Sequence, residues 1–267
     1  MTTLSLTKHH GLGNDFLVAF RPVVDDLPGL ARRLCDLRRG VGADGLLVAE
    51  AAAGHTARMV LYNADGSRAE MSGNGIRCFA QALASKRGDL SEQSILTDAG
   101  ERLVALEATD DAATLRATVD MGEVEPLDEP TGWAVLGCHP DRPVAHLSLG
   151  NPHSVVGVDE VAAVDLAHLG GQVPHVNLEI VEPGPTTDAI TMKVHERGSG
   201  ITEACGTGAC AAAYAARSWG LVNAGVDEVV VHMDGGTATV AFRPDAPRRA
   251  ILTGPATYVA TIEVSLS

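Results

Sequence analysis

Two glycine-rich turns each place a reactive side chain directly before a run of small and apolar residues. The first reads AEMSGNGIRCF, with Ser72 ahead of the glycines, and the second reads EACGTGACAAAYAA, with Cys205 in the equivalent place. A glycine turn that enters a helix presents free backbone N–H groups and the positive end of the helix dipole, so it binds anions such as carboxylate or phosphate. We expect a cysteine there to ionise more easily, because the same donors stabilise its thiolate.

The two turns belong to a chain that carries an internal repeat. Segments of the first half recur in the second half in the same order, at offsets between 132 and 137 residues in a chain of 267. Because the four pairs of segments occur in the same order and at nearly the same offset, they indicate a duplication rather than a coincidence of short motifs. We therefore predict two similar halves that face each other. The paired segments are LGNDFLV with LGNPHSVV, ADGLLVAE with HVNLEIVE, RMVLYN with TMKVHE, and SGNGIRCFAQAL with CGTGACAAAYAA.

Hydrophobic spacing predicts an α+β fold. Apolar residues recur at helical spacing after Ser72, and Gly88 is a suitable stop for that helix. The run after Cys205 is so uniformly small and apolar that its helix should be buried on most sides. The stretches TLRATVDM, ATVAF and YVATIEVSL alternate apolar and polar residues, which is typical of antiparallel strands with one wet face. We predict two pseudo-symmetric domains in which antiparallel strands wrap around a central helix.

The predicted boundary between the halves lies near residue 120. Residues 121–143 are rich in proline and form the best candidate for the crossover. The predicted N-terminal half is residues 1–120, and the predicted C-terminal half is residues 121–253.

Composition restricts the partners and the compartment. Hydrophobic residues make up 45% of the chain, which is enough for a sizeable core, although aromatic residues make up only 3%. The net charge of −14 argues against nucleic-acid binding, which needs a basic face. The N-terminal stretch has no apolar core of a signal peptide, and no apolar run reaches membrane-spanning length. The five scattered cysteines fit a reducing cytoplasm, and neither cysteine nor histidine spacing suggests a metal site. We expect a cytoplasmic protein with a small-molecule substrate and no nucleic-acid or membrane partner.

Two opposed turns of this kind suit the inversion of a carbon next to a carboxylate. Inversion requires that a proton leave one face of the carbon and that another arrive on the opposite face. The carbanion-like state spreads charge onto the carboxylate, where the helix N-termini meet it. A thiol suits both roles, because its ordinary pKa of about 8.5 lies close to neutrality.

Longer motifs resemble those of the diaminopimelate epimerase family. They are HGLGNDF, RRGVGADG, YNADGSRAEMSGNGIRCFA, GNPHSV, VNLEIVE, HERGSGITEACGTGACA and the C-terminal GPATYV. The resemblance implies an isomerase of lysine and peptidoglycan-precursor synthesis that needs no cofactor and converts LL-2,6-diaminopimelate into the meso form. It also implies a two-domain pseudo-symmetric fold in which a C-terminal strand, residues 254–267, returns to the first half. A homodimer is compatible with the resemblance, but the sequence does not identify the surface involved.

The resemblance also assigns roles to individual positions. Cys205 matches the second catalytic thiol, which faces the hydrogen of the meso isomer, and Ser72 stands where the family has its first thiol, facing the hydrogen of the LL isomer. Glu196 matches a residue that lies near the second thiol and meets the distal ammonium of the substrate. His153 matches a residue beside the first catalytic position. The residues matched to substrate binding at the non-reacting end are Asn14, Asn63, Asn151, Asn177 and Arg197. The backbone donors around the reacting carboxylate come from Gly73, Asn74, Gly206 and Thr207.

Ser72 leaves three interpretations open, because an alcohol is a much weaker acid and base than a thiol. In the first, serine is the natural residue and His153 takes or relays the proton. In the second, serine is an engineered replacement that impairs or inactivates the epimerase. In the third, inversion has been lost, and Cys205 acts as the single base of a related racemase or dehydratase, or the protein only binds an amino acid.

Overall fold

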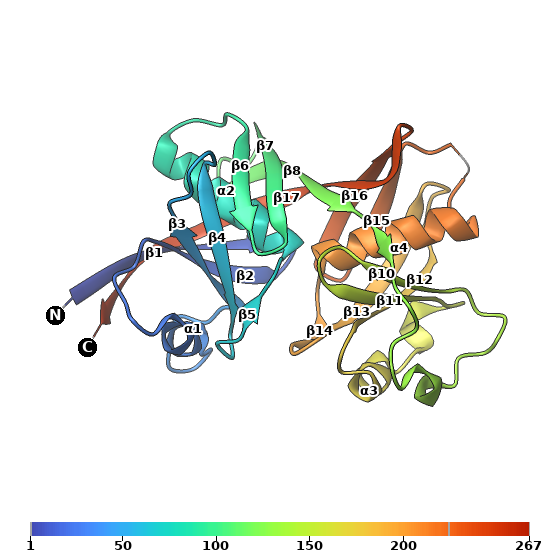
Figure 1. Cartoon of the computed structure of the whole chain (residues 1–267). Coiled ribbons are helices and arrows are strands. Elements are labelled where there is room, and N and C mark those ends of the chain that lie inside the picture. The colour runs from blue at the N-terminus through green and yellow to red at the C-terminus, as the bar shows by residue number, and fades with distance from the viewer. Residues whose placement is uncertain (1, 224, 267) are drawn as a thin grey trace. The chain divides into compact units, whose positions relative to one another are not determined.

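The chain folds into two compact units, each built from strands and a long helix. The computed structural model describes residues 2–223 and 225–266 (Figure 1). One unit contains the chain up to Val119 together with the segment from Gly254 onward, and the other contains Asp120 to Thr253. The last strand, β17 (Ala246–Leu266), therefore begins in the second unit and ends in the first.

The first unit contains two helices and most of the first eight strands, and β8 runs on into the second unit. The bounds are β1 Thr2–Gly11, β2 Asn14–Phe20, α1 Leu27–Cys35, β3 Gly45–Glu50, β4 Ala57–Asn63, β5 Arg68–Ala69, α2 Gly73–Arg87, β6 Gln93–Thr97, β7 Gly100–Ala108 and β8 Thr114–Glu123.

The second unit repeats this arrangement with two additional short 3₁₀ helices, η1 and η2. The bounds are β9 Glu125–Pro126, η1 Trp133–Leu136, β10 Val144–Ser148, β11 Pro152–Gly157, η2 Val161–Ala163, α3 Leu166–Gln172, β12 Asn177–Pro183, β13 Ala189–Glu196, β14 Gly200–Thr202, α4 Gly206–Trp219, β15 Glu228–Met233 and β16 Gly236–Arg243.

Strand pairing follows one pattern in both units. In the first unit β1 pairs antiparallel with β2, β2 pairs parallel with β3, and β3 pairs antiparallel with β4. In the second unit β10, β11, β12 and β13 repeat this order of directions. The register places Phe16 opposite Gly45 in one unit and His153 opposite Asn177 in the other. The predicted α+β fold of two similar units is therefore confirmed.

The sheets also contain parallel pairs, which the prediction of antiparallel strands left out. Besides β2 with β3 and β11 with β12, the parallel pairs include β4 with β6 and β13 with β15. In each case a helix lies between the two strands in the chain, and such a crossover allows the second strand to run in the same direction as the first. Alternation of apolar and polar residues indicates that one face of a strand is exposed to solvent, but it does not indicate the direction of the neighbouring strand.

Helices α2 and α4 are the central helices of the two units, and both are enclosed by strands (Figure 1). Helix α2 packs against β1, β2, β4 and β7, and α4 packs against β10 to β13, β15 and β16. Most residues of α4 are buried, as its small side chains predict. Both helices end at a glycine in the left-handed conformation, Gly88 with φ 77° and Gly220 with φ 73°, and this confirms the predicted stop at Gly88.

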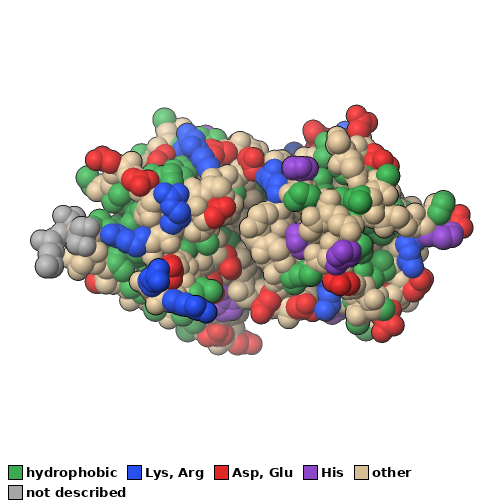
Figure 2. Space-filling model, turned by 90° about the horizontal axis from the view of Figure 1, so that it is seen from below, with side chains coloured by type: hydrophobic (Ala, Val, Ile, Leu, Met, Phe, Trp, Pro, Cys, Tyr) green, Lys and Arg blue, Asp and Glu red, His purple; other side chains and the backbone are tan. Residues whose placement is uncertain are grey.

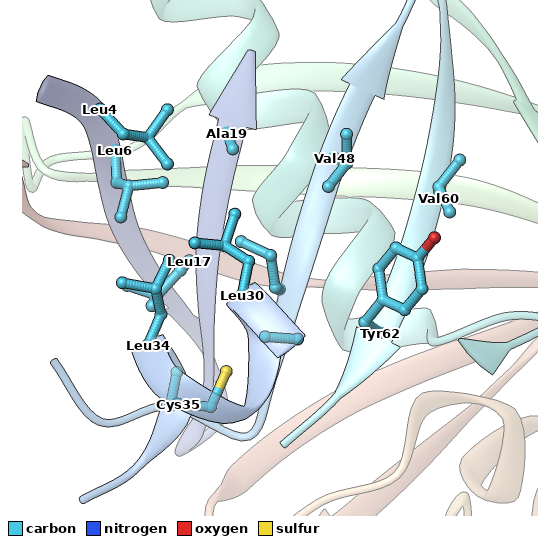
Figure 3. Packing of buried hydrophobic residues seen from close by; sticks show 13 residues of the cluster. Leu4, Leu6, Leu17, Ala19, Leu30, Leu34, Cys35, Val48, Val60 and Tyr62 are labelled. Atoms are coloured by element: carbon cyan, nitrogen blue, oxygen red, sulfur yellow. The ribbon is translucent and has the colours of Figure 1, made fainter. Parts of the chain in front are cut away.

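The cores are aliphatic, as the low aromatic content requires. In the first unit α1 packs its buried face, which includes Leu30 and Leu34, against side chains of β1 to β4 (Figure 3). In the second unit Leu166 of α3 and Trp133 of η1 belong to a cluster on β12 that also includes Ile180. These outer layers hold the strands against the central helices.

The surface carries many acidic side chains. Asp and Glu are scattered over the face shown in Figure 2, in keeping with the net charge of −14. Among the described residues, none of the helices combines the length and the apolar character needed to cross a membrane.

Replacing Phe79 with Ala should lower the free energy of unfolding by about 3–5 kcal/mol, because the ring is fully buried on α2 and its loss leaves a cavity. Urea denaturation followed by circular dichroism would measure the change. Ser85→Ala, at an exposed position of the same helix, is the control and should stay within about 0.5 kcal/mol of the parent. A loss below about 1 kcal/mol for Phe79→Ala would contradict tight packing around α2.

Candidate active site

Ser72 and Cys205 occupy the same position in their respective units. Each is the N-cap of a central helix in an extended conformation, with φ −139° and ψ 122° for Ser72 and φ −128° and ψ 117° for Cys205. The Gly75 N–H donates to Ser72 Oγ at 3.0 Å, and the Gly208 N–H donates to Cys205 Sγ at 3.4 Å. Each turn thus holds its reactive atom beside backbone donors of the kind that bind a carboxylate.

The third residue after each cap is a glycine that lies close against a strand. A Cβ at Gly75 would lie 3.3 Å from Phe16 Cζ, and a Cβ at Gly208 would lie 2.6 Å from Glu179 Oε1. At the second distance the buried Glu179 side chain would have to move. The motif therefore needs a small residue here for close packing as well as for the turn.

A buried arginine supports the Ser72 turn. The side chain of Arg77 is fully buried on α2. Its Nη1 donates to the Gly73 carbonyl at 3.1 Å, its Nη2 donates to Asn74 Oδ1 at 2.9 Å, and its Nε donates to the Pro255 carbonyl at 3.1 Å. The rigid guanidinium fork ties the first turn of α2 to the returning strand β17 and fixes the orientation of Asn74.

Two more of the predicted substrate residues lie in the first unit. Asn74 Nδ2 donates to Asn14 Oδ1 at 3.4 Å, and Asn14 Nδ2 donates to Asp44 Oδ2 at 2.6 Å. Asn63 is half-buried at the end of β4, where it pairs in register with Gly45, the residue after Asp44. Asn14 is therefore joined directly to the Ser72 turn through Asn74.

A chain of hydrogen bonds leads from the Cys205 turn into the core of the second unit. Thr207 Oγ1 lies 3.5 Å from Cys205 Sγ and accepts from Asn151 Nδ2 at 3.2 Å. Asn151 Oδ1 lies 3.0 Å from His153 Nε2, and His153 Nδ1 lies 2.6 Å from Glu179 Oε1. His153 and Glu179 are both fully buried. The resemblance placed His153 beside the first catalytic position, whereas these bonds join it to the Cys205 turn of its own unit.

The remaining predicted residues of the second unit lie on the strands around this turn. Asn177 Nδ2 donates to the Pro152 carbonyl at 3.0 Å, and Asn177 Oδ1 accepts from the Arg197 backbone N–H at 2.9 Å. Glu196 is half-buried at the end of β13, and its Oε1 accepts from Thr202 Oγ1 at 2.5 Å. Arg197 is exposed in the turn that follows.

The expectation that Cys205 ionises easily is wrong for this structure. Burial raises the pKa of the Cys205 thiol well above its ordinary value, and the carboxylates of Glu196 and Glu179 raise it further. The Thr207 hydroxyl and the Gly208 N–H lower the pKa but do not prevail. The sequence showed the helix N-terminus that favours the thiolate, but it did not show the burial and the two acids that oppose it.

The two half-sites differ in the layer behind the turn. The positions that correspond to His153 and Glu179 in the first unit are held by Phe16 and Leu47, both buried. Burial raises the pKa of Glu179, while His153 acts in the opposite direction. The thiol is thus backed by a polar pair, and the serine is backed by apolar side chains.

The structure groups the predicted residues by unit. Gly73 and Gly206 are the first residues of α2 and α4, and both are buried. Sequence reasoning missed several side chains that hold the predicted residues in place. A charged residue inside an apolar run, as in GIRCF and NLEIV, was the available signal for two of them. The missed residues are Asp44, Arg77, Glu179 and Thr202.

Within residues 2–223 and 225–266, no group of three or more His, Cys, Asp or Glu side chains is arranged to hold a metal ion.

Comparison with known proteins gives one consistent result. The model of the family described as diaminopimelate epimerase matches residues 6–127 and 146–259. A protein named diaminopimelate epimerase from Geobacillus kaustophilus (strain HTA426) is 36% identical over 98% of this chain and 96% of its own length. Another protein of that name, from Thermosynechococcus vestitus, is 38% identical over 96% of this chain and 98% of its own length.

A solved structure supports the fold. The crystal structure of a hydroxyproline epimerase from Agrobacterium vitis, with bound trans-4-hydroxy-L-proline, superposes with a TM-score of 0.76. It covers 99% of this chain and 93% of its own, at 16% sequence identity. At that identity the similarity shows a common fold.

Replacing Glu196 with Gln should lower the pKa of the Cys205 thiol, because one of the two carboxylates that oppose the thiolate is removed. The pH dependence of Cys205 alkylation by iodoacetamide, read by peptide mass spectrometry, should then shift to lower pH. Glu203→Gln, which neutralises an exposed acid two residues before the thiol, is the matched control and should leave the profile in place. Equal profiles for Glu196→Gln and the parent would rule out this electrostatic effect.

Proposed function

The chain belongs to the diaminopimelate epimerase family, an isomerase family of amino-acid biosynthesis, and from this premise we propose that it interconverts LL- and meso-2,6-diaminopimelate by two-base proton transfer. The two bases are Cys205 and Ser72. The observation that carries the proposal is the equivalence of these residues as N-caps of the two central helices. No cofactor takes part in the proposed reaction.

In the direction from LL to meso, Ser72 removes the α-proton and Cys205 delivers one. The C–H bond breaks, its electron pair spreads onto the adjacent carboxylate, and a new C–H bond forms on the opposite face with the proton of the thiol. The backbone N–H groups of the two turns stabilise the negative charge on the carboxylate. The high pKa of Cys205 supports this assignment, because the thiol form is the proton donor.

In the reverse direction Cys205 has to act as a base, and the substrate itself assists it. By family resemblance Glu196 meets the distal ammonium of the substrate. That ammonium offsets the negative charge of Glu196, which otherwise raises the pKa of the thiol. Substrate binding therefore lowers the pKa of Cys205 and favours its thiolate form. Asn14, Asn63, Asn151, Asn177 and Arg197 complete the proposed set of substrate contacts.

Ser72 is the slower of the two groups. Within the described part of its own unit, the turn and the positive end of α2 stabilise its alkoxide, whereas a thiol would ionise far more readily. Both nitrogens of His153 are engaged by Glu179 and Asn151, so we assign His153 to the Cys205 half-site and not to a relay from Ser72. Inversion is therefore slow, while exchange at Cys205 proceeds.

The second candidate is a protein in which Cys205 exchanges a proton on one face without inversion. The observation that favours it is the apolar layer of Phe16 and Leu47 behind Ser72, which offers no acid or base to assist an alcohol. Formation of the other isomer separates this candidate from the epimerase, because both exchange the α-hydrogen with solvent but only the epimerase inverts the carbon.

Proton NMR in D2O under reducing conditions tests the proposal. The parent protein should exchange the α-hydrogen of meso-diaminopimelate and form the LL isomer slowly. Ser72→Cys should raise the rate of inversion by about 10²-fold or more, in the range of general acid–base catalysis. Cys205→Ala should abolish exchange from the meso isomer.

Three outcomes of this experiment would contradict the proposal. Full exchange by Cys205→Ala would show that Cys205 is not the base. Exchange from meso without any LL product, in both the parent and Ser72→Cys, would favour the one-base candidate. Tight binding of diaminopimelate without exchange would favour a binding protein.

A further inference from the structure

We propose that the buried pair of His153 and Glu179 is a positioning pair for Cys205: it fixes the side-chain amide of Asn151 so that the Thr207 hydroxyl donates its proton to the Cys205 sulfur. The inference rests on the proposed function for the catalytic role of Cys205. It assigns roles to Glu179 and to the Thr207 hydroxyl, neither of which the sequence patterns had singled out.

The direction of each hydrogen bond follows from the chemistry of its neighbour. Asn151 Nδ2 can only donate, so Thr207 Oγ1 must accept from it at 3.2 Å. The single proton of the Thr207 hydroxyl is then left for the Cys205 sulfur, 3.5 Å away. A hydroxyl that donates to sulfur favours the thiolate over the thiol.

The orientation of Asn151 depends in turn on His153. With Nδ2 directed at Thr207, the amide oxygen faces His153 Nε2 at 3.0 Å and needs a proton on that nitrogen. Glu179 Oε1 lies 2.6 Å from Nδ1. One proton shared between these two atoms leaves the other ring proton on Nε2, where it donates to the Asn151 oxygen.

Burial makes the arrangement rigid. His153, Glu179 and Thr207 are each at most 1% exposed, so no bulk water competes for their hydrogen bonds. The pair also costs desolvation energy that a hydrophobic pair would avoid. The first unit shows that the fold accommodates a hydrophobic pair here, because Phe16 and Leu47 occupy the positions that correspond to His153 and Glu179. A purely structural role does not explain why only the half-site with the thiol carries the polar pair.

The charged groups around the thiol come from three strands. Glu179 on β12 and Glu196 on β13 repel the thiolate directly, and His153 on β11 lies behind Asn151. A test must therefore separate the loss of charge from the loss of hydrogen-bond direction. A double-mutant cycle does so, because the charge effect persists when the Thr207 hydroxyl is absent, whereas the directional effect does not.

The experiment measures the rate of Cys205 alkylation by iodoacetamide at fixed pH, read by peptide mass spectrometry, so it does not depend on epimerase activity. Thr207→Val should slow alkylation by about tenfold, the effect of one lost hydrogen bond to a charged group, and Thr207→Ser should restore the rate. Ser154→Ala, which removes another buried hydroxyl beside His153, is the control and should change nothing, because Ser154 bonds to His146 instead.

The end of the hydrogen-bond chain farthest from Cys205 is tested by Glu179→Leu. Leucine is the residue at the corresponding position of the first unit, Leu47. In the Thr207→Val background this change should only speed alkylation, because repulsion is removed. In the parent background it should speed alkylation about tenfold less, or slow it, because the direction of the Thr207 hydroxyl is lost as well. Equal effects in the two backgrounds would overturn the proposal and leave Glu179 with a charge effect alone.

An isosteric second variant covers the case in which Glu179→Leu does not fold, as judged by thermal denaturation. Asn151→Asp still accepts from His153 but has no proton for Thr207, so the hydroxyl should turn toward the new carboxylate. Asn151→Asp should slow alkylation about tenfold more in the parent than in the Thr207→Val background. Equal slowing in both backgrounds would overturn the proposal.

The same variants separate this proposal from the proposed function. If the effect of Asn151→Asp depends on Thr207 as expected but the parent protein does not invert diaminopimelate, the proposed function fails and the positioning pair stands.

Discussion

The capping of a buried helix by a reactive side chain is the interaction on which the rest of the structure depends. Ser72 Oγ and Cys205 Sγ each accept an N–H of the first helical turn, so each reactive atom is held where the helix dipole and free backbone donors converge. Strands pack around both helices, and the first turns of both are buried. Without that enclosure, the donors would be satisfied by solvent and would have little effect on an anion.

The same enclosure creates the conflict that defines the Cys205 half-site. Burial and two carboxylates disfavour the thiolate, while the helix terminus and Thr207 favour it. The influences that favour the thiol prevail, and groups on the substrate can shift this balance. A catalytic group that must both give and take a proton benefits when a charge on the substrate can shift its pKa, because the same thiol then donates in one direction and accepts in the other.

Duplication gave the two units one backbone plan and left the layer behind each turn to diverge. The strand order and the capped central helix recur, yet a buried histidine and glutamate in one unit correspond to phenylalanine and leucine in the other. In the first unit a buried arginine, Arg77, supports the turn from the helix side instead. Each half-site thus has its own means of holding an asparagine or threonine next to the cap.

The sequence by itself determined the repeat, the two capped helices, the α+β class and the family, because each depends on local spacing or on long motifs. It did not determine strand direction, since alternation is the same in parallel and antiparallel pairs. It also misjudged the ionisation of Cys205 and left Glu179 and Arg77 unassigned. Those properties depend on which side chains from distant strands are buried together, and only the tertiary structure decides the desolvation and the charges that each group meets.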